Sequence, residues 1–363
     1  MNRRRVLAAL GGLGSVGIGA YHTHTTTISE PGARDGQLLL GISPEALDLD
    51  ELSAMEHWLG QRHAIVVRFW DLGINEETIE ANVEGGLTGL WRNGYIPLVM
   101  LQPFFGDETP TDITRQIANG KHDETIDHWA RILGNWVNQG RTPHDRRVYL
   151  SVAPEMNGDW TPWSPAAGDT DEQDFIDMWR AIHDRFVDAG LEDHRAQWMW
   201  TVNHTSRDTS IDALYPGDDY VDWTSIHGYN WYRWGGWADA EHIYGGAIRR
   251  IRRTTDRPLA ITEFGCSSEV ADGHDPERKG KWIRETFDYF HEQDIRMACI
   301  FNIDKETDWA VFGGERGTAT TEVGGEPRNV YPAYREVVQD RDVLGPHPEH
   351  RRILADDEFM GRF

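Results

Sequence analysis

Two glutamates occupy positions where the sequence could support acid and base chemistry. Glu155 ends the run "SVAPE" and Glu263 ends the run "PLAITE". Both runs are typical of buried β-strands, and parallel strands of one sheet carry their C-terminal ends to the same edge. Hydrolysis of a glycosidic bond requires such a pair of carboxyl groups: one protonates the leaving oxygen, and the other attacks the anomeric carbon or activates water. The alternative is a structural pair without chemistry.

The residues around these glutamates are suited to binding sugars. Indole rings stack on sugar faces, and amides and hydroxyls bind ring hydroxyls. Tryptophans inside amphipathic helices are instead expected to belong to the core, namely Trp129, Trp136, Trp179 and Trp282. The residues predicted to contact a sugar lie on loops or at strand ends, in "MNGDWTPW" and "SIHGYNWYRW": Asn157, Trp160, Trp163, His227, Tyr229 and Trp231.

The rest of the pattern predicts the framework that positions these groups. Longer helical runs separate or follow most of eight short β-rich runs, and one of them, "DFIDMWRAIHDRFVDAG", repeats its apolar residues at helical spacing. Eight such units predict an α/β fold, the (β/α)8 TIM barrel, with chemistry at the C-terminal ends of the strands. An open doubly wound sheet is the second candidate, although no glycine-rich phosphate loop follows the first strand. The strand runs are "LLLGIS", "AIVVRFW", "IPLVMLQP", "RVYLSVAPE", "AQWMWTVN", "VDWTSIHGYN", "PLAITEFG" and "RMACIFNI".

The chain is expected to divide into four segments. Residues 1–20 have a charged start and a short apolar stretch, which predicts a twin-arginine-like export signal and an extracellular protein, with retention as an N-terminal anchor as the alternative. Residues 21–36 are predicted to be a linker, 37–340 the barrel, and 341–363 a C-terminal extension. No stable membrane partner is expected unless the signal stays uncleaved.

The amino-acid composition limits the kinds of partner that the protein is expected to bind. With 60 Asp and Glu against 36 Lys and Arg, the formal charge is −24, which argues against nucleic acid or an anionic membrane as a partner. Only four residues are Lys, which predicts a protein that is soluble at very high salt; an ordinary acidic secreted protein is the alternative. Cys266 and Cys299 lack metal-ligand spacing and are expected to pack in the core, or to form one bridge outside the cell.

Four separated motifs resemble one known family. In this order and at these spacings, "PEMNGDWTPW", "WMWTVN", "YPGDDYVDWTSIHGYNW" and "ITEFG" are similar to the family 26 glycoside hydrolases, best known as endo-β-1,4-mannanases. The resemblance covers about residues 60–312. It implies that Glu155 is the general acid/base, that Glu263 is the nucleophile and that Tyr229 lies beside the nucleophile. It also implies that Trp309, after the eighth strand, forms the floor under the reacting sugar.

The chain departs from the family pattern at three positions. Pro154 replaces a His, Ser151 stands where an Arg is common, and His227 replaces the Asp of "IDGYNW". A proline offers neither an imidazole nor a backbone N–H, so one substrate contact is expected to be missing.

The predicted function is therefore a secreted retaining glycoside hydrolase that cleaves β-linked polysaccharide, with β-1,4-mannan as the first choice. Aromatic walls and the second carboxylate are expected to raise the pKa of Glu155 so that it acts as a general acid. The substrate would be a polysaccharide or oligosaccharide, and no metal or organic cofactor is predicted. The alternatives are a β-1,3/1,4-glucanase or xylanase on the same barrel, or a barrel that binds carbohydrate without cleaving it.

Overall fold

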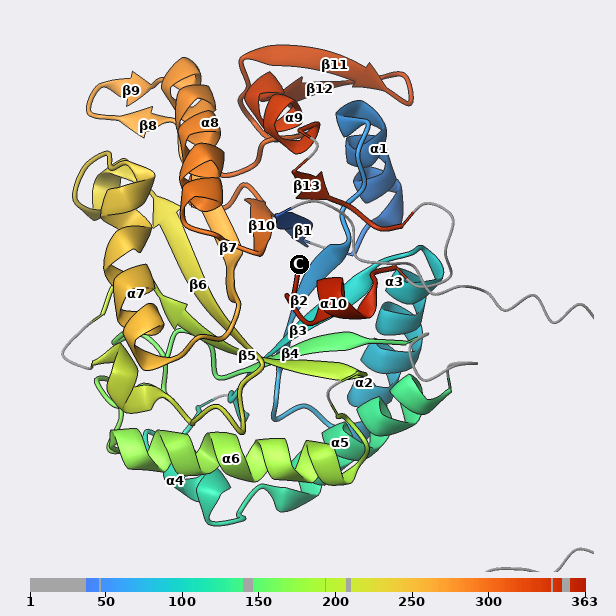
Figure 1. Cartoon of the computed structure of the whole chain (residues 1–363), viewed down its shortest axis with the longest axis vertical. Helices are drawn as coiled ribbons and strands as arrows, with labels where there is room; N and C mark the ends of the chain where they lie inside the picture. Colours follow the sequence, from blue (N-terminus) through green and yellow to red (C-terminus); the bar gives the residue numbers. More distant parts are fainter. Residues whose placement is uncertain are drawn as a thin grey trace, which may run out of the picture. The chain divides into compact units, whose positions relative to one another are not determined.

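Eight parallel strands close into a barrel in the computed structural model, which describes residues 37–45, 47–106, 108–139, 146–192, 194–206, 210–340, 342–347 and 353–363 (Figure 1). The last strand pairs with the seventh and also with the first, where Leu39 lies opposite Met297, so the sheet has no open edge there. The predicted (β/α)8 barrel is confirmed. Its strands are β1 (Leu38–Pro44), β2 (Ile65–Asp71), β3 (Ile96–Gln102), β4 (Val148–Val152), β5 (Ala196–Asn203), β6 (Trp223–Asn230), β7 (Leu259–Cys266) and β10 (Met297–Asn302).

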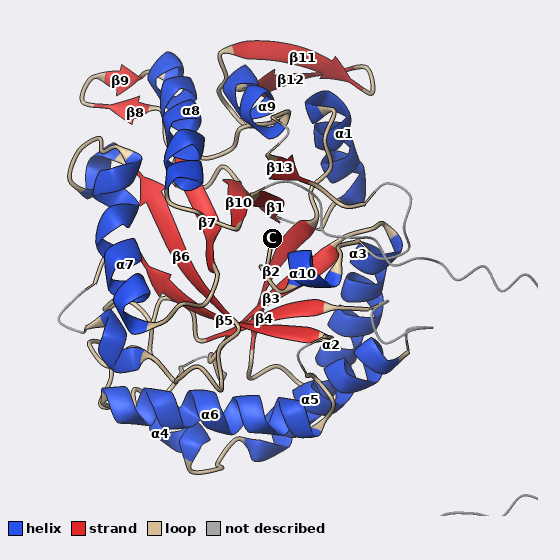
Figure 2. Cartoon of the chain, in the orientation of Figure 1, coloured by secondary structure: helices blue, strands red, loops and turns tan. Residues whose placement is uncertain are grey.

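Helices surround the strands, as Figure 2 shows, and their apolar faces form the outer core. The four helical tryptophans predicted to be core are buried. Several helices begin at an Asp whose carboxylate accepts a backbone N–H, such as Asp171 before α6. The main helices are α1 (Leu49–Leu59), α2 (Glu76–Glu80), α3 (Thr88–Arg92), α4 (Ile113–Ala118), α5 (Asp123–Asn138), α6 (Glu172–Asp188), α7 (Ala240–Thr254), α8 (Pro276–Glu292) and α9 (Pro332–Val338).

The chain also contains short elements that the sequence pattern did not predict. Between α2 and α3 the helix widens into a π-helical stretch, η1 (Ala81–Leu87), which contains two adjacent glycines. The other additions are two single-turn 3₁₀ helices, η2 (Ile211–Leu214) and η3 (Tyr232–Trp234), and two hairpins, β8 (Glu269–Val270) with β9 (Gly273–His274) and β11 (Ala319–Val323) with β12 (Glu326–Val330).

The C-terminal segment closes the N-terminal end of the barrel. Strand β13 (Val343–Leu344) pairs with β1, and α10 (Asp356–Phe359) lies at the barrel's end (Figure 1). The buried ring of Phe359 lies 4.7 Å from that of Tyr149, and its carbonyl accepts hydrogen bonds from Tyr149 and Trp223. The segment that the sequence suggested was an extension therefore contributes to the barrel core.

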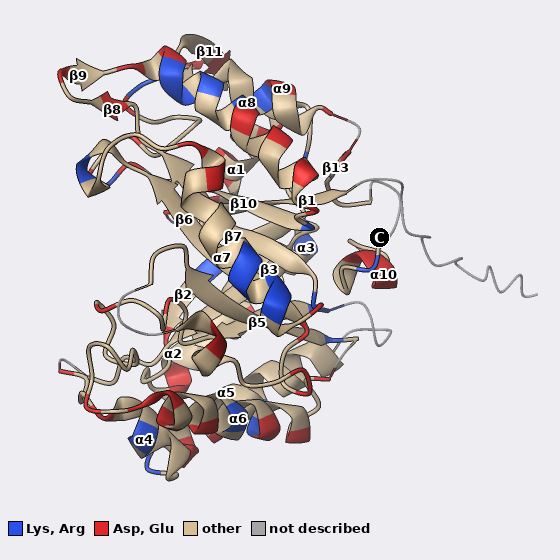
Figure 3. Ribbon diagram, turned by 60° about the vertical axis from the view of Figure 1, so that its left-hand side comes forward, with Lys and Arg blue, Asp and Glu red and all other residues tan. Residues whose placement is uncertain are grey.

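Acidic and basic residues both occur on the helices around the barrel, and α7 and α8 each carry four Lys or Arg residues (Figure 3). Cys266 and Cys299 are both buried and both free. Within the described ranges, no helix is long and apolar enough to span a bilayer. The predicted export signal (1–20) and linker (21–36) lie outside the described residues.

We expect Phe359→Ala to lower the free energy of unfolding by about 3–5 kcal/mol, because it removes a large buried ring from the barrel interior. Urea denaturation followed by tryptophan fluorescence measures this change. Phe363→Ala is the matched control, since that ring is only half-buried near the end of the chain. Equal losses in the two variants would contradict a packing role for Phe359.

Candidate active site

A cleft of about 540 Å³ opens at the C-terminal ends of the barrel strands. Both predicted catalytic glutamates line it, together with Trp160, His227 and Trp309. A larger cavity of about 810 Å³ lies at the opposite end of the strands, but its lining is mainly Asp and Arg, without tryptophan. Because TIM barrels carry their chemistry at the C-terminal ends of the strands, the first cleft is the candidate site.

A strained turn carries Glu155 into the cleft. Directly after β4, both Ala153 (φ 50°) and Glu155 (φ 61°) adopt the left-handed conformation on either side of Pro154. The Glu155 N–H donates to the carbonyl of Thr201, and the Trp163 indole donates to the carbonyl of Pro154. Left-handed backbone is unfavourable for residues with a Cβ, so it persists only where the surroundings enforce it, as at functional sites.

A bulge in β7 turns Glu263 toward the barrel interior. Ile226 of β6 pairs with Ile261, but His227 pairs with Glu263, so one extra residue, Thr262, is inserted. The Thr262 hydroxyl contacts Ser225 inside the barrel, and the adjacent Glu263 also reaches interior partners. Neighbouring residues of a regular strand face opposite sides, so the bulge allows both to point inward.

Two hydroxyls hold Glu263 in place. The Ser43 hydroxyl donates to Oε1 at 2.7 Å, and the Tyr229 hydroxyl donates to Oε2. Burial and the nearby negative charge of Glu263 raise the pKa of Tyr229 well above its usual value, so its proton remains available for this bond. Tyr229 was expected here from the family resemblance, whereas Ser43 was not, although Ser43 ends the first predicted strand run and the barrel rule points to strand ends.

His227 links the two glutamates. Its Nδ1 lies 2.9 Å from Oε1 of Glu155 and 3.7 Å from Oε2 of Glu263. The sum of these two distances is therefore an upper limit on the separation of the two carboxylate oxygens. The spacing of about 5–5.5 Å between the carboxyl groups of retaining glycosidases lies within that limit. Oε2 of Glu155 accepts a second hydrogen bond, from the Trp160 indole at 2.8 Å.

The pKa of Glu155 moves opposite to the expected direction. Burial does raise it, but the hydrogen bond and positive charge of His227, together with the Trp160 N–H, outweigh burial and hold the pKa below its usual value. For His227, burial lowers the pKa, but the charges of Glu263 and Glu155 outweigh burial and raise it. The predicted aromatic walls are present, and the expectation was wrong because it omitted the imidazole.

Beneath the carboxylates, a chain of buried hydroxyls crosses four strands. Ser151 contacts Thr201 at 2.7 Å, Ser225 donates to Thr201 at 2.7 Å, and Ser225 contacts Thr262 at 2.9 Å. Ser151 is one of the three departures from the family pattern. In this chain, its small hydroxyl fits this internal network.

An aromatic cluster forms another wall of the cleft. The Trp309 ring lies 5.4 Å from Tyr229, 5.7 Å from Trp231 and 6.0 Å from Trp234. Trp309 itself is buried, with 1% of its surface exposed, so it does not offer the open face expected of a floor under the sugar. Trp160 is 47% exposed and Trp234 is 58% exposed, so both can meet a ligand. The Trp231 indole donates to Glu269 at 2.7 Å, which fixes its orientation.

Asn157 and Trp163 were expected to contact a sugar, but in this structure both are fully buried. The Asn157 amide bonds to the backbone of Asn203 and Thr205. Trp163 packs its ring against Phe104. Their polar groups thus hold the loop that carries Glu155 and Trp160.

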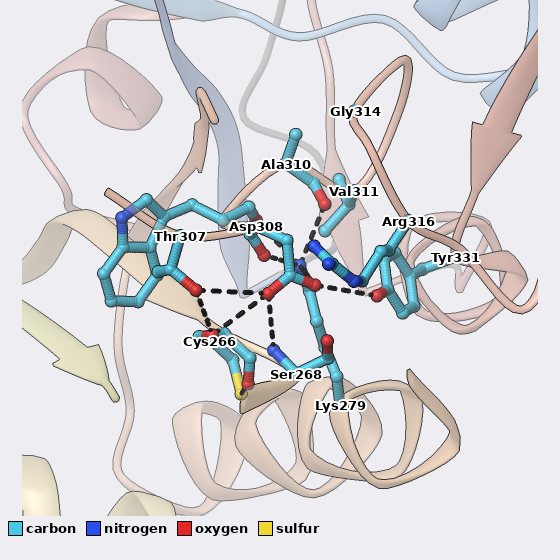
Figure 4. Close-up of polar contacts among 12 residues, drawn as sticks. Cys266, Ser268, Lys279, Thr307, Asp308, Ala310, Val311, Gly314, Arg316 and Tyr331 are labelled. Carbon is cyan, nitrogen blue, oxygen red and sulfur yellow. Dashed lines mark hydrogen bonds and ion pairs between the residues drawn. The ribbon is translucent and has the colours of Figure 1, made fainter. Parts of the chain in front are cut away.

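A buried ion pair supports the loop of Trp309, as Figure 4 shows. The fully buried ammonium of Lys279 on α8 lies 3.9 Å from Asp308 and donates to the carbonyls of Asp308, Trp309 and Ala310. Asp308 also accepts hydrogen bonds from Ser267 and the N–H of Ser268. Burial opposes ionisation, but Lys279 and these donors outweigh it and hold the pKa of Asp308 below its usual value.

The sequence analysis also missed Arg68, which lies on β2 and lines the cleft. Burial lowers its pKa. Within the described part of the chain, no cluster of three or more His, Cys, Asp and Glu side chains could hold a metal ion.

Comparison with known proteins finds relatives that are enzymes by name. No family model matches the chain. The chain is 28% identical over 271 residues to endoglucanase H of Acetivibrio thermocellus, covering 72% of the chain but 27% of that protein. It is 24% identical over 248 residues to a mannan endo-1,4-beta-mannosidase of Bacillus subtilis, covering 62% of the chain and 64% of that protein. The chain thus spans less than two thirds of either relative.

Solved structures share the fold. The catalytic domain of a GH26 endo-beta-1,4-mannanase from Bacillus sp. JAMB-750 matches with a TM-score of 0.64 and 17% identity, over 88% of the chain and 90% of that structure. A mannanase of Bacillus subtilis, man26, matches with a TM-score of 0.59 and 19% identity, over 85% and 87%. At 19% and 17% identity, these two structures show a shared fold alone. The two sequence relatives are named as an endoglucanase and a mannosidase, which are glycoside hydrolases, the class that the motifs indicated.

We expect Lys279→Met to lower the free energy of unfolding by about 3–5 kcal/mol, because it leaves Asp308 buried without its cation. Adding Asp308→Asn should recover part of this loss, since the uncompensated charge is then removed. Lys281→Met, an exposed position on the same helix, serves as the control in urea denaturation. A loss no larger than that of Lys281→Met would rule out the supporting role of Lys279.

Proposed function

We propose that this protein is a retaining glycoside hydrolase that cleaves β-linked polysaccharide, with Glu263 as nucleophile and Glu155 as general acid/base. The observation that carries the proposal is the approach of both carboxylates to one imidazole nitrogen at the bottom of an aromatic-lined cleft. Retention requires two carboxyl groups this close, so that one can attack the sugar directly while the other protonates the leaving oxygen.

In the proposed mechanism, Glu263 attacks the anomeric carbon while Glu155 protonates the glycosidic oxygen, which leaves as an alcohol. Glu155 then takes a proton from water as that water displaces Glu263 from the glycosyl-enzyme. Ser43 and Tyr229 donate hydrogen bonds to the two oxygens of Glu263, which restricts the rotation of its carboxylate. The exposed indoles of Trp160 and Trp234 would stack on the sugar chain, and the buried Trp309 would support this wall from behind.

The polymer proposed first is β-1,4-mannan, because the relative from Bacillus subtilis and the matched solved structures are mannanases by name. A β-glucan is the second candidate, because the relative that shares more of the chain is named an endoglucanase. The departures at Pro154 and His227, both of which line the cleft, also favour testing a second sugar.

Export to the extracellular space is proposed from residues 1–20, since a polysaccharide is too large to reach a cytoplasmic enzyme. Adaptation to high salt is proposed from the charge of −24 and the near absence of lysine.

We expect the wild type to release reducing ends from mannan, glucomannan, mixed-linkage β-glucan or xylan. Glu263→Ala and Glu155→Ala should each lose activity on the cleaved polymer by about a thousandfold or more, because each removes one of the two reacting carboxyl groups. Glu336→Ala, an exposed position on α9, is the control. Folding of each variant is checked by circular dichroism. Full activity in Glu263→Ala would exclude it as the nucleophile, and a folded wild type that binds but cleaves none of the polymers would favour the binding-only barrel.

We also expect the midpoint of thermal unfolding to rise between about 0.1 M and about 1 M NaCl, because the screening length falls from about 10 Å to about 3 Å and weakens the repulsion among surface acids. Calorimetry at each salt concentration measures this. A midpoint that stays constant or falls over this range of salt would contradict a stabilising effect of charge screening.

A further inference from the structure

His227 holds a fixed position between the two carboxylates. It lies within β6 with 1% of its surface exposed, and its backbone carbonyl accepts the N–H of His204 at 2.8 Å. The centre of the Phe69 ring lies 6.2 Å from the centre of the imidazole, in an edge-to-face arrangement. The imidazole therefore cannot turn away from Glu155 or Glu263 without disrupting the barrel interior.

The surroundings favour a proton on this ring. Nδ1 faces carboxylate oxygens of both Glu155 and Glu263, and a carboxylate oxygen accepts hydrogen bonds but donates none when ionised. When both carboxylates are ionised, Nδ1 therefore carries the hydrogen of this contact. Nε2 is buried and has no partner among the described residues. The raised pKa of His227 and the lowered pKa of Glu155 agree with a proton that resides on the imidazole in the free protein.

We propose that His227 stores the proton that Glu155 delivers to the glycosidic oxygen, so that the two side chains act together as one acid. The inference rests on the proposed function of the cleft. It makes His227 a positioning and proton-holding residue that acts through Glu155, in place of the sugar contact that the sequence predicted.

The proton balance is complete within these groups. As Glu263 gives an electron pair to the anomeric carbon and the bond to the leaving oxygen breaks, Glu155 protonates that oxygen and receives the proton of Nδ1. His227, an imidazolium before this step, is then a neutral imidazole with its remaining hydrogen on Nε2, and Glu263 is an ester. In the second half-reaction, water gives one proton to Glu155, the proton returns to Nδ1, and Glu263 leaves as a carboxylate.

The charge of Glu263 would couple the transfer of the proton from His227 to the attack on the sugar. At 3.7 Å, an ionised Glu263 favours the imidazolium, and ester formation removes that charge in the same step in which the proton is needed. Other titratable groups near His227 or its two partners are Tyr229 on Glu263, His204 beyond β6 and the buried Cys299 thiol near Glu263. The cleft wall adds Glu45, Arg68, Lys305 and Glu306.

The test is the pH dependence of kcat/KM on the polymer that the wild type cleaves. Activity should fall as pH rises through the value at which the Glu155 and His227 pair loses its proton. In His227→Asn the proton can sit only on Glu155, so this alkaline limb should move to lower pH by about one unit or more. His57→Asn, exposed on α1, is the control and should keep the wild-type profile. A lower rate with an unmoved limb would overturn the proposal, because a structural role alone gives that result.

A second measurement needs no activity and does not depend on the folding of His227→Asn. Nitrogen-15 NMR of the histidine-labelled wild type and of Glu155→Gln follows the imidazole nitrogens through a pH titration. The proposal expects one buried imidazole that stays protonated above pH 6.5 and loses its proton at lower pH in Glu155→Gln. Failure to find an imidazole whose titration depends on Glu155 would refute it. A wild type that cleaves no polymer would refute the proposed function instead, while the location of the proton would still be decided.

Discussion

Two carboxylates held in one cleft repel each other, and the site depends on how the fold compensates that repulsion. The compensating donors come from separate parts of the barrel: Ser43 from β1, His227 and Tyr229 from β6, and Trp160 from the loop after β4. They meet only because β10 pairs with both β7 and β1 and closes the ring. The same low dielectric that makes unpaired charges unfavourable strengthens these hydrogen bonds. Closure of the barrel therefore brings these donors to the two carboxylates and fixes their positions.

A buried ion pair supports the aromatic wall of the cleft. The Trp309 loop is held from below by Lys279, whose ammonium bonds to three consecutive carbonyls and pairs with Asp308. A buried ion pair contributes little net stability by itself, but it fixes a geometry strongly because either charge alone would be unfavourable there. A flat, rigid aromatic surface suits sugar rings, which bind by shape and stacking more than by charge.

Position 227 shows how one substitution can alter the acid chemistry of a shared fold. The family pattern implies an Asp at this position, whereas an imidazole here brings a proton that can be shared with Glu155. That proton reverses the direction in which burial alone would shift the pKa of Glu155. The pH range of the reaction would then be set by a pair of side chains, as expected for strongly coupled titrating groups.

The sequence by itself determined the eight β/α units, the buried faces of the helices and the strand-end positions of Glu155 and Glu263, because hydrophobic periodicity is local and the barrel rule converts strand ends into a site. It also identified Tyr229 and Trp309 through motifs. Only the tertiary structure decided that β7 carries a bulge aiming Glu263 inward, that Trp163 is buried while Trp160 is exposed, and that Ser43 and Lys279 belong to the site. These features arise from contacts between residues far apart in the chain, and no local pattern records which of them will meet.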